Sequence, residues 1–126
     1  MSEWPRTNRA ARMGDHLTAR LLDLADRFEQ IGDVRGRGLL VGLELVEDRA
    51  SKRPASALGA AVTDECLRRG LSMNIVKGDG SQTNCFRMAP PLSVTTAEID
   101  LAVSIIEDAL AACLDARAAA DVHRIT

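Results

Sequence analysis

The fold is decided at Cys85-Phe86-Arg87-Met88-Ala89-Pro90-Pro91, where one arginine lies inside a short apolar run that two prolines terminate. Side chains alternate between the two faces of a strand, so Arg87 shares a face with small residues while Phe86 and Met88 lie on the opposite face. Proline has no N–H to donate to a sheet, and the strand is therefore expected to end just past the arginine. The stretch predicts a strand over residues 85–89 that carries a guanidinium close to its end.

The side chain of Arg87 has two interpretations. Its guanidinium is permanently charged, and its fork of donors suits a carboxylate or phosphate held by two parallel hydrogen bonds. Alternatively, its aliphatic stem covers a half-buried strand and its charged head reaches solvent. Spacing alone favours the solvated arginine, because most arginines in strands are exposed.

Three stretches on either side repeat apolar residues at the spacing of amphipathic helices. They predict helices over residues 9–30, 55–69 and 96–115. Gly70 follows the second stretch at a position where helices commonly end, and Thr95 to Glu98 have the spacing of a capping box before the third. Residues beyond Arg117 are expected to form a loose tail.

Two further apolar runs predict strands over residues 39–46 and 71–76. The glycine-rich residues 31–38 are interpreted as a bend leading into the first of them, and Arg35 and Gly36 are assigned to that bend. A phosphate-binding loop is the weaker alternative there, because the GxGxxG pattern is not completed. The order of elements predicts an α+β fold in which three helices pack on a small three-stranded sheet, with the last two strands forming a long-looped hairpin.

The composition of the chain excludes several classes of protein. The chain has 126 residues, a formal net charge of -2 and 46% hydrophobic residues, which suits one domain over 1–126 with a core at about 8–115. No apolar run approaches a membrane span and no signal peptide is recognisable, so a cytoplasmic protein is expected. Scattered arginines among many acids, with few aromatics, argue against nucleic-acid binding.

No catalytic group is apparent. The three cysteines are odd in number and form no CxxC, and the two histidines lack partners at ligand spacing, so neither a disulfide nor a metal site is predicted. The sequence shows no nucleophile paired with a base and no pair of carboxylates. Glu44 is a lone acid, expected to be exposed or paired with an arginine.

Three segments resemble one enzyme family. The segment Ile31 to Glu44 resembles the start of the small C-terminal domain of class III aminotransferases, which are pyridoxal-phosphate enzymes of fold type I. Gly70 to Val76 and Phe86 to Leu92 are most similar to the 2,2-dialkylglycine decarboxylases, which couple decarboxylation to transamination. The resemblance runs in unbroken order from about Asn8 to Leu110.

The resemblance implies a role for Arg87. In this family the arginine of the matching segment binds the substrate carboxylate, and it corresponds to Arg87. Such binding would fix which bond to the substrate Cα is weakened by the cofactor. The substrates implied are amino acids and 2-oxo acids, and the complete enzyme is expected to be a homo-oligomer.

Complete family members are several times longer. Their cofactor lysine and phosphate-binding loop belong to a preceding large domain, which holds the pyridoxal phosphate and is missing here. Neither Lys52 nor Lys77 matches the cofactor lysine, so the chain itself is expected to hold no cofactor-binding or catalytic residue and to be inactive alone. The chain therefore resembles a C-terminal fragment of a decarboxylase or transaminase; the alternative is a non-catalytic, stand-alone domain that binds a partner chain or a small carboxylate.

Overall fold

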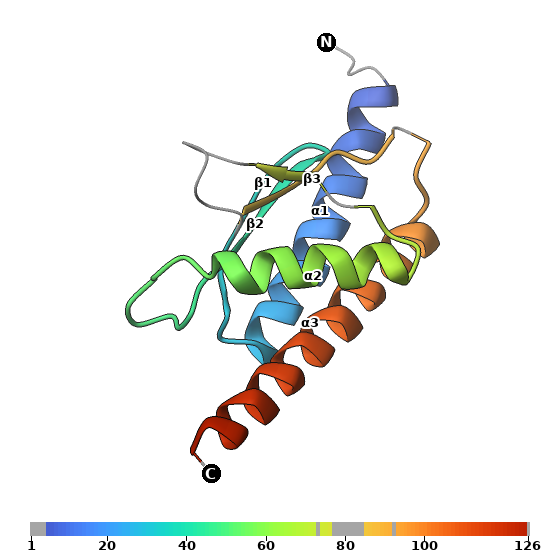
Figure 1. Ribbon diagram of the computed structural model, residues 1–126. Coiled ribbons are helices and arrows are strands. Elements are labelled where there is room, and N and C mark those ends of the chain that lie inside the picture. The colour runs from blue at the N-terminus through green and yellow to red at the C-terminus, as the bar shows by residue number, and fades with distance from the viewer. Residues whose placement is uncertain (1–4, 73, 77–84, 92, 126) are drawn as a thin grey trace.

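The computed structural model describes residues 5–72, 74–76, 85–91 and 93–125. Within these residues, three helices and four strands follow one another (Figure 1). Their bounds are α1 Pro5–Arg27, β1 Ile31–Arg37, β2 Leu40–Leu45, α2 Ser56–Arg68, β3 Asn74–Val76, β4 Cys85–Met88 and α3 Thr96–Ile125. None of the helices in the described part of the chain is long and apolar enough to cross a membrane.

The four strands form one sheet in the order β1-β2-β4-β3, and each neighbouring pair is antiparallel. Side chains alternate as expected along β2, where Val41, Leu43 and Leu45 are buried and the residues between them are more exposed. The buried side chains meet the inner faces of the helices in a single hydrophobic core. The helices therefore cover one face of the sheet, with α3 packed against both α1 and α2.

The predicted fold class, three helices packed on a small antiparallel sheet, is confirmed, as is the hairpin of β3 and β4. The number of strands needs correction, because residues 31–37, interpreted as a bend, form the edge strand β1. A two-residue turn at Gly38 and Leu39 joins β1 to β2, and the φ of +56° at Gly38 suits the first position of a II′ hairpin turn.

The glycines of β1 serve packing rather than bending. A Cβ at Gly32 would lie 2.7 Å from Cγ1 of Val46, and one at Gly36 would lie 2.7 Å from Oγ1 of Thr18. Both distances are shorter than side chains tolerate, so glycine lets the strand approach its neighbours closely. Local sequence cannot distinguish this use of glycine from a turn.

Helix α1 contacts the turn between β1 and β2 backbone to backbone. Gly14 is buried, and a Cβ there would overlap the carbonyl oxygen of Gly38. Leu17, Leu21 and Leu24 continue the same inner side of α1 into the core. The helix and the turn thus fix the position of β1 and β2 relative to the core.

Both predicted helix-end motifs are confirmed. Before α3, the backbone N–H of Thr95 donates to Oε1 of Glu98 at 2.9 Å, and the N–H of Glu98 donates to Oγ1 of Thr95 at 3.2 Å. After α2, Gly70 has a φ of +95°, and the N–H of Leu71 donates to the carbonyl of Cys66 at 2.8 Å. This is the bonding pattern of a Schellman motif.

Two helix bounds differ from the prediction. Helix α1 begins at Pro5, and α3 continues to Ile125 where a loose tail was expected beyond Arg117. The last turns of α3 project beyond the rest of the molecule (Figure 1). They are rich in alanine, the strongest helix former, so local propensity maintains the helix where tertiary contacts end.

Candidate functional site

Arg87 lies in β4, between β2 and β3, one residue before the strand ends. It is paired across the strands with Gly42 of β2 and Asn74 of β3. Phe86 is fully buried on the helix-covered face, whereas Arg87 is exposed on the opposite face. The alternation predicted for this strand is confirmed, and it carries the guanidinium onto the face of the sheet away from the helices.

A hollow of about 370 Å³ lies where Arg87 emerges. Besides Phe86, its lining consists of Arg35, Gly36, Leu40, Gly42, Cys85 and Arg87. Gly42 lies at its centre, because the register pairs Gly42 with Arg87 on one side and with Arg35 on the other. Since glycine has no side chain, the space between the two arginines is open.

The two arginines differ in their charge partners. Nε of Arg35 lies 2.7 Å from Oδ2 of Asp33, and its Nη2 lies 3.3 Å from Oε2 of Glu44. The expected pairing of Glu44 with an arginine is thereby confirmed. For Arg87, no hydrogen-bond or ion-pair partner occurs within the described ranges of the chain. Its donors are therefore available to an anionic ligand.

Arg35 is the residue of this hollow that the sequence interpretation missed. It was assigned to a bend, but it lies in a strand and faces the same hollow as Arg87. Reading residues 31–37 and 40–45 as a hairpin closed by Gly38 and Leu39 would have placed Arg35 opposite Gly42. That pairing was the signal available in the sequence.

A second hollow, of about 220 Å³, lies between β4 and the helices α1 and α3. Its lining is mainly apolar, with Leu17, Met88 and Ile106 among the contributors. Glu98 also borders it, but this carboxylate caps α3. Arg87 borders this hollow as well, so it lies between the two hollows, and the rest of the second hollow's described lining offers no available charged group.

Cys66 and Cys113 are poor nucleophiles. Burial, reinforced by the nearby Cys113, raises the pKa of the Cys66 thiol to about 11. Burial is also the main cause that raises the pKa of Cys113 above its ordinary value. Both thiols are therefore neutral at pH 7, when only a thiolate would react readily.

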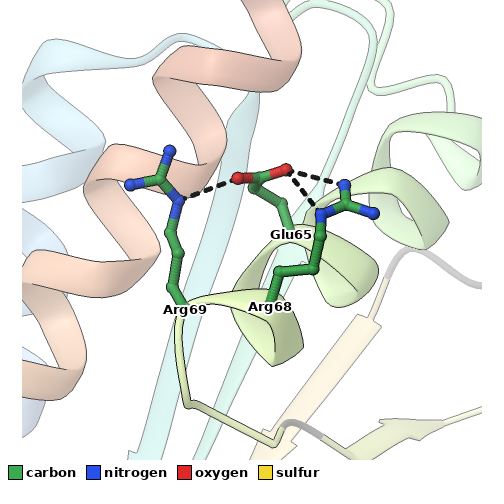
Figure 2. Close-up of polar contacts among 3 residues, drawn as sticks. All are labelled: Glu65, Arg68 and Arg69. Carbon is green, nitrogen blue, oxygen red and sulfur yellow. Dashed lines mark hydrogen bonds and ion pairs between the residues drawn. The ribbon is translucent and has the colours of Figure 1, made fainter.

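The largest cluster of ion pairs on α2 stabilises the helix surface. Figure 2 shows Glu65 between Arg68 and Arg69, with its Oε1 accepting from Nη2 of Arg68 at 2.7 Å and its Oε2 accepting from Nε of Arg69 at 2.9 Å. These hydrogen bonds, that of Arg68 first, lower the pKa of Glu65 below its ordinary value. The three side chains satisfy one another, so the carboxylate is not available as a base.

The described residues do not fit a covalently held pyridoxal phosphate. Such a site needs a lysine whose pKa is shifted by its surroundings, whereas Lys52 is exposed in a surface turn, with a φ of +55°. Lys77 lies outside the described residues. Within the described part of the chain, no group of three or more histidine, cysteine, aspartate or glutamate side chains could hold a metal ion.

Comparison with known proteins gives a consistent result. Residues 3–110 match the family model described as aminotransferase class-III. The chain is 42% identical over 102 residues to taurine–pyruvate aminotransferase of Rhodobacter capsulatus, covering 79% of the chain and 22% of that enzyme. It is 35% identical over 108 residues to human mitochondrial alanine–glyoxylate aminotransferase 2, covering 84% of the chain and 20% of that enzyme.

A solved structure agrees with these relatives. An amine transaminase from an uncultivated Pseudomonas species, in a pyridoxal-phosphate-bound form, matches with a TM-score of 0.72 and 33% identity over 83% of the chain and 23% of that structure. The chain spans about a fifth of the length of the curated relatives that it matches.

Proposed function

The chain belongs to the class-III aminotransferase family, and from that premise we propose that Arg87 binds the carboxylate of an amino-acid or 2-oxo-acid substrate in a longer pyridoxal-phosphate enzyme. One observation carries this proposal: Arg87 is exposed at the hollow on the open sheet face and has no charge partner among the described residues. A permanently charged fork held on a central strand suits a two-pronged grip on a carboxylate.

The contribution of Arg87 is orientation. A carboxylate held by two parallel hydrogen bonds has little freedom to rotate, so the bonds to the adjacent Cα take a fixed direction. The backbone of β4 is itself fixed, because it is paired on both sides and because the neighbouring Phe86 is fully buried. A rigid strand of this kind is a more precise support for a ligand contact than a loop.

We propose that residues 1–126 form one domain, with a core at about 8–115, and that the cofactor is held by parts of the enzyme outside this chain. None of the described residues is a lysine that could bind the cofactor covalently, which supports a cofactor site formed by other parts of the enzyme. The chain alone is then inactive.

We also propose the finer activity that the segments Gly70 to Val76 and Phe86 to Leu92 suggest, namely decarboxylation coupled to transamination. In that reaction a 2,2-dialkylglycine and a 2-oxo acid give carbon dioxide, a dialkyl ketone and the new amino acid. A full-length enzyme containing this chain should release carbon dioxide from a 2,2-dialkylglycine in step with amino-acid formation. If the enzyme transaminates alanine but releases no carbon dioxide from the dialkylglycine, it is a transaminase without decarboxylase activity.

The experiment for Arg87 is substitution in such a full-length enzyme. Arg87→Ala removes one or two charge-assisted hydrogen bonds, each worth roughly 1.5–3 kcal/mol. We expect kcat/KM for carboxylate substrates to fall by about 10- to 10⁴-fold. Arg87→Lys should restore only part of the rate, because an ammonium cannot reproduce the fork.

Two controls separate binding from folding. Amine substrates without a carboxylate should be affected less by Arg87→Ala, and Arg12→Ala, at an exposed arginine of α1 outside the hollow, should leave the kinetics unchanged. An equal loss for carboxylate and amine substrates, together with a sharp fall in Tm, would show that Arg87 is structural. The alternative of a stand-alone carboxylate-binding domain requires that the chain bind acetate through Arg87 without any partner domain.

A further inference from the structure

Arg35 and Arg87 occupy one row of the sheet. The register pairs Arg87 with Gly42 and Gly42 with Arg35, so the two arginines lie on either side of a single glycine. Both line the hollow of about 370 Å³ on the open face. Strands lie about 4.8 Å apart, which puts the two backbones about 10 Å from each other. Arginine side chains are long enough to converge on one small ligand over that span.

Arg35 is held in place and still has donors to offer. Asp33 engages its Nε and Glu44 approaches its Nη2, whereas a guanidinium carries five N–H donors. The side chain is 70% exposed, so its remaining donors are accessible. Because the two carboxylates restrict its rotamers, Arg35 loses less conformational entropy when a ligand binds.

Gly42 keeps the space between the arginines free. A Cβ at this position would come no closer than 3.8 Å to the carbonyl oxygen of Phe86 and 3.9 Å to that of Arg35. The backbone therefore tolerates a side chain at residue 42. A larger residue would extend into the hollow and separate Arg35 from Arg87.

We propose that Arg35 is a specificity-determining residue that receives a second anionic group, so that the hollow takes ligands with two carboxylates: one on Arg87 and one on Arg35. This inference rests on the proposed function insofar as Arg87 holds the first carboxylate. The acceptor of the amino group is accordingly a 2-oxo dicarboxylate, which becomes an acidic amino acid, whereas a 2,2-dialkylglycine engages Arg87 alone. Asp33 and Glu44 together balance the charges of Arg35 and Arg87, so attraction for the ligand rests on the local positions of the guanidinium donors rather than on net charge.

The test uses a full-length enzyme containing this chain and two probes, succinate and acetate. Binding is followed by isothermal titration calorimetry at low, constant ionic strength, since salt screens exposed charges. An exposed ion pair changes an equilibrium by up to about fivefold. Arg35→Gln should therefore weaken succinate binding by roughly three- to fivefold and leave acetate binding unchanged.

Two further variants test the open space at Gly42 and the effect of an arginine outside the hollow. Gly42→Val should keep the fold, since valine suits a strand, and weaken succinate binding as much as Arg35→Gln does. Arg12→Gln, at an exposed arginine of α1 that does not line the hollow, is the matched control and should change neither probe. Circular-dichroism spectra of every variant should remain those of the folded enzyme.

The outcomes distinguish the two proposals. If Arg35→Gln leaves succinate binding unchanged while Arg87→Gln weakens both probes, the second anion contact is wrong and the role of Arg87 survives. If Arg87→Gln weakens neither probe, the proposed function itself is contradicted. If Arg12→Gln weakens succinate as much as Arg35→Gln does, general surface charge accounts for binding and the inference is overturned.

Discussion

Arginines with the same chemistry perform different tasks in this chain because their neighbours differ. Arg68 is tied to Glu65 on a helix surface, and Arg35 is tied to Asp33 and Glu44 on a strand. Arg87 lacks a carboxylate partner among the described residues, although it lies on a central strand next to a hollow. The distinction comes from which carboxylates lie next to each arginine in the folded chain, so it was not available from the identity of the residue.

The close packing of Gly14 gives a prediction about the stability of the chain. Glycine to alanine in a helix interior ordinarily stabilises by about 1 kcal/mol, but a Cβ at Gly14 would overlap the carbonyl oxygen of Gly38. Relieving that overlap requires movement of the backbone, and overpacking of this kind costs about 1–3 kcal/mol.

We therefore expect Gly14→Ala to lower the free energy of unfolding, measured by urea denaturation. The sign of the change in the free energy of unfolding separates the two effects, because helix propensity favours alanine whereas packing against Gly38 disfavours it. A stabilised variant would show that α1 does not contact the β1–β2 turn as described.

At the scale of elements, sequence motifs predicted the structure correctly where the interacting residues are close together in the sequence. The capping box at Thr95 and the Schellman motif at Gly70 involve residues within a few positions of each other, and both are confirmed. The strand β1 was missed because its glycines pack against Val46 and Thr18, which are distant in sequence. Because residues 31–37 were interpreted as a bend, Arg35 could not be placed opposite Gly42. Its contribution to the lining of the hollow was therefore not predicted.

The capping box gives a prediction at this scale. Thr95→Ala removes the acceptor for the N–H of Glu98 and should destabilise the chain by about 1 kcal/mol. Thr96→Ala, at the first residue of α3 itself, is the matched control and should have little effect. Thermal unfolding of both variants measures the difference. Equal Tm values for the two variants would contradict a capping role for Thr95.

At the scale of the whole molecule, the helices cover one face of the sheet and the opposite face carries the candidate site. Leu40, on β2, is 49% exposed beside the hollow, so part of the hollow's rim is apolar. The core is complete without that face, because the buried side chains of the sheet and of all three helices meet on the other side. The arrangement is consistent with a domain that folds around its own core and presents its open face to a ligand.

The whole chain should not capture the cofactor covalently. A stable Schiff base requires a lysine that is held in place and lowered in pKa, and Lys52 is exposed in a turn. After incubation with pyridoxal phosphate and reduction with borohydride, mass spectrometry should show no stoichiometric adduct on one lysine. Such an adduct would contradict the proposal that the cofactor is held outside this chain.

The most direct measurement of the central claim is a crystal structure of a full-length enzyme containing this chain, with a carboxylate substrate analogue bound. We predict that both carboxylate oxygens accept hydrogen bonds from Arg87, at N–O distances of about 2.7–2.9 Å. A carboxylate bound by other residues, with the Arg87 guanidinium directed into solvent, would contradict the claim.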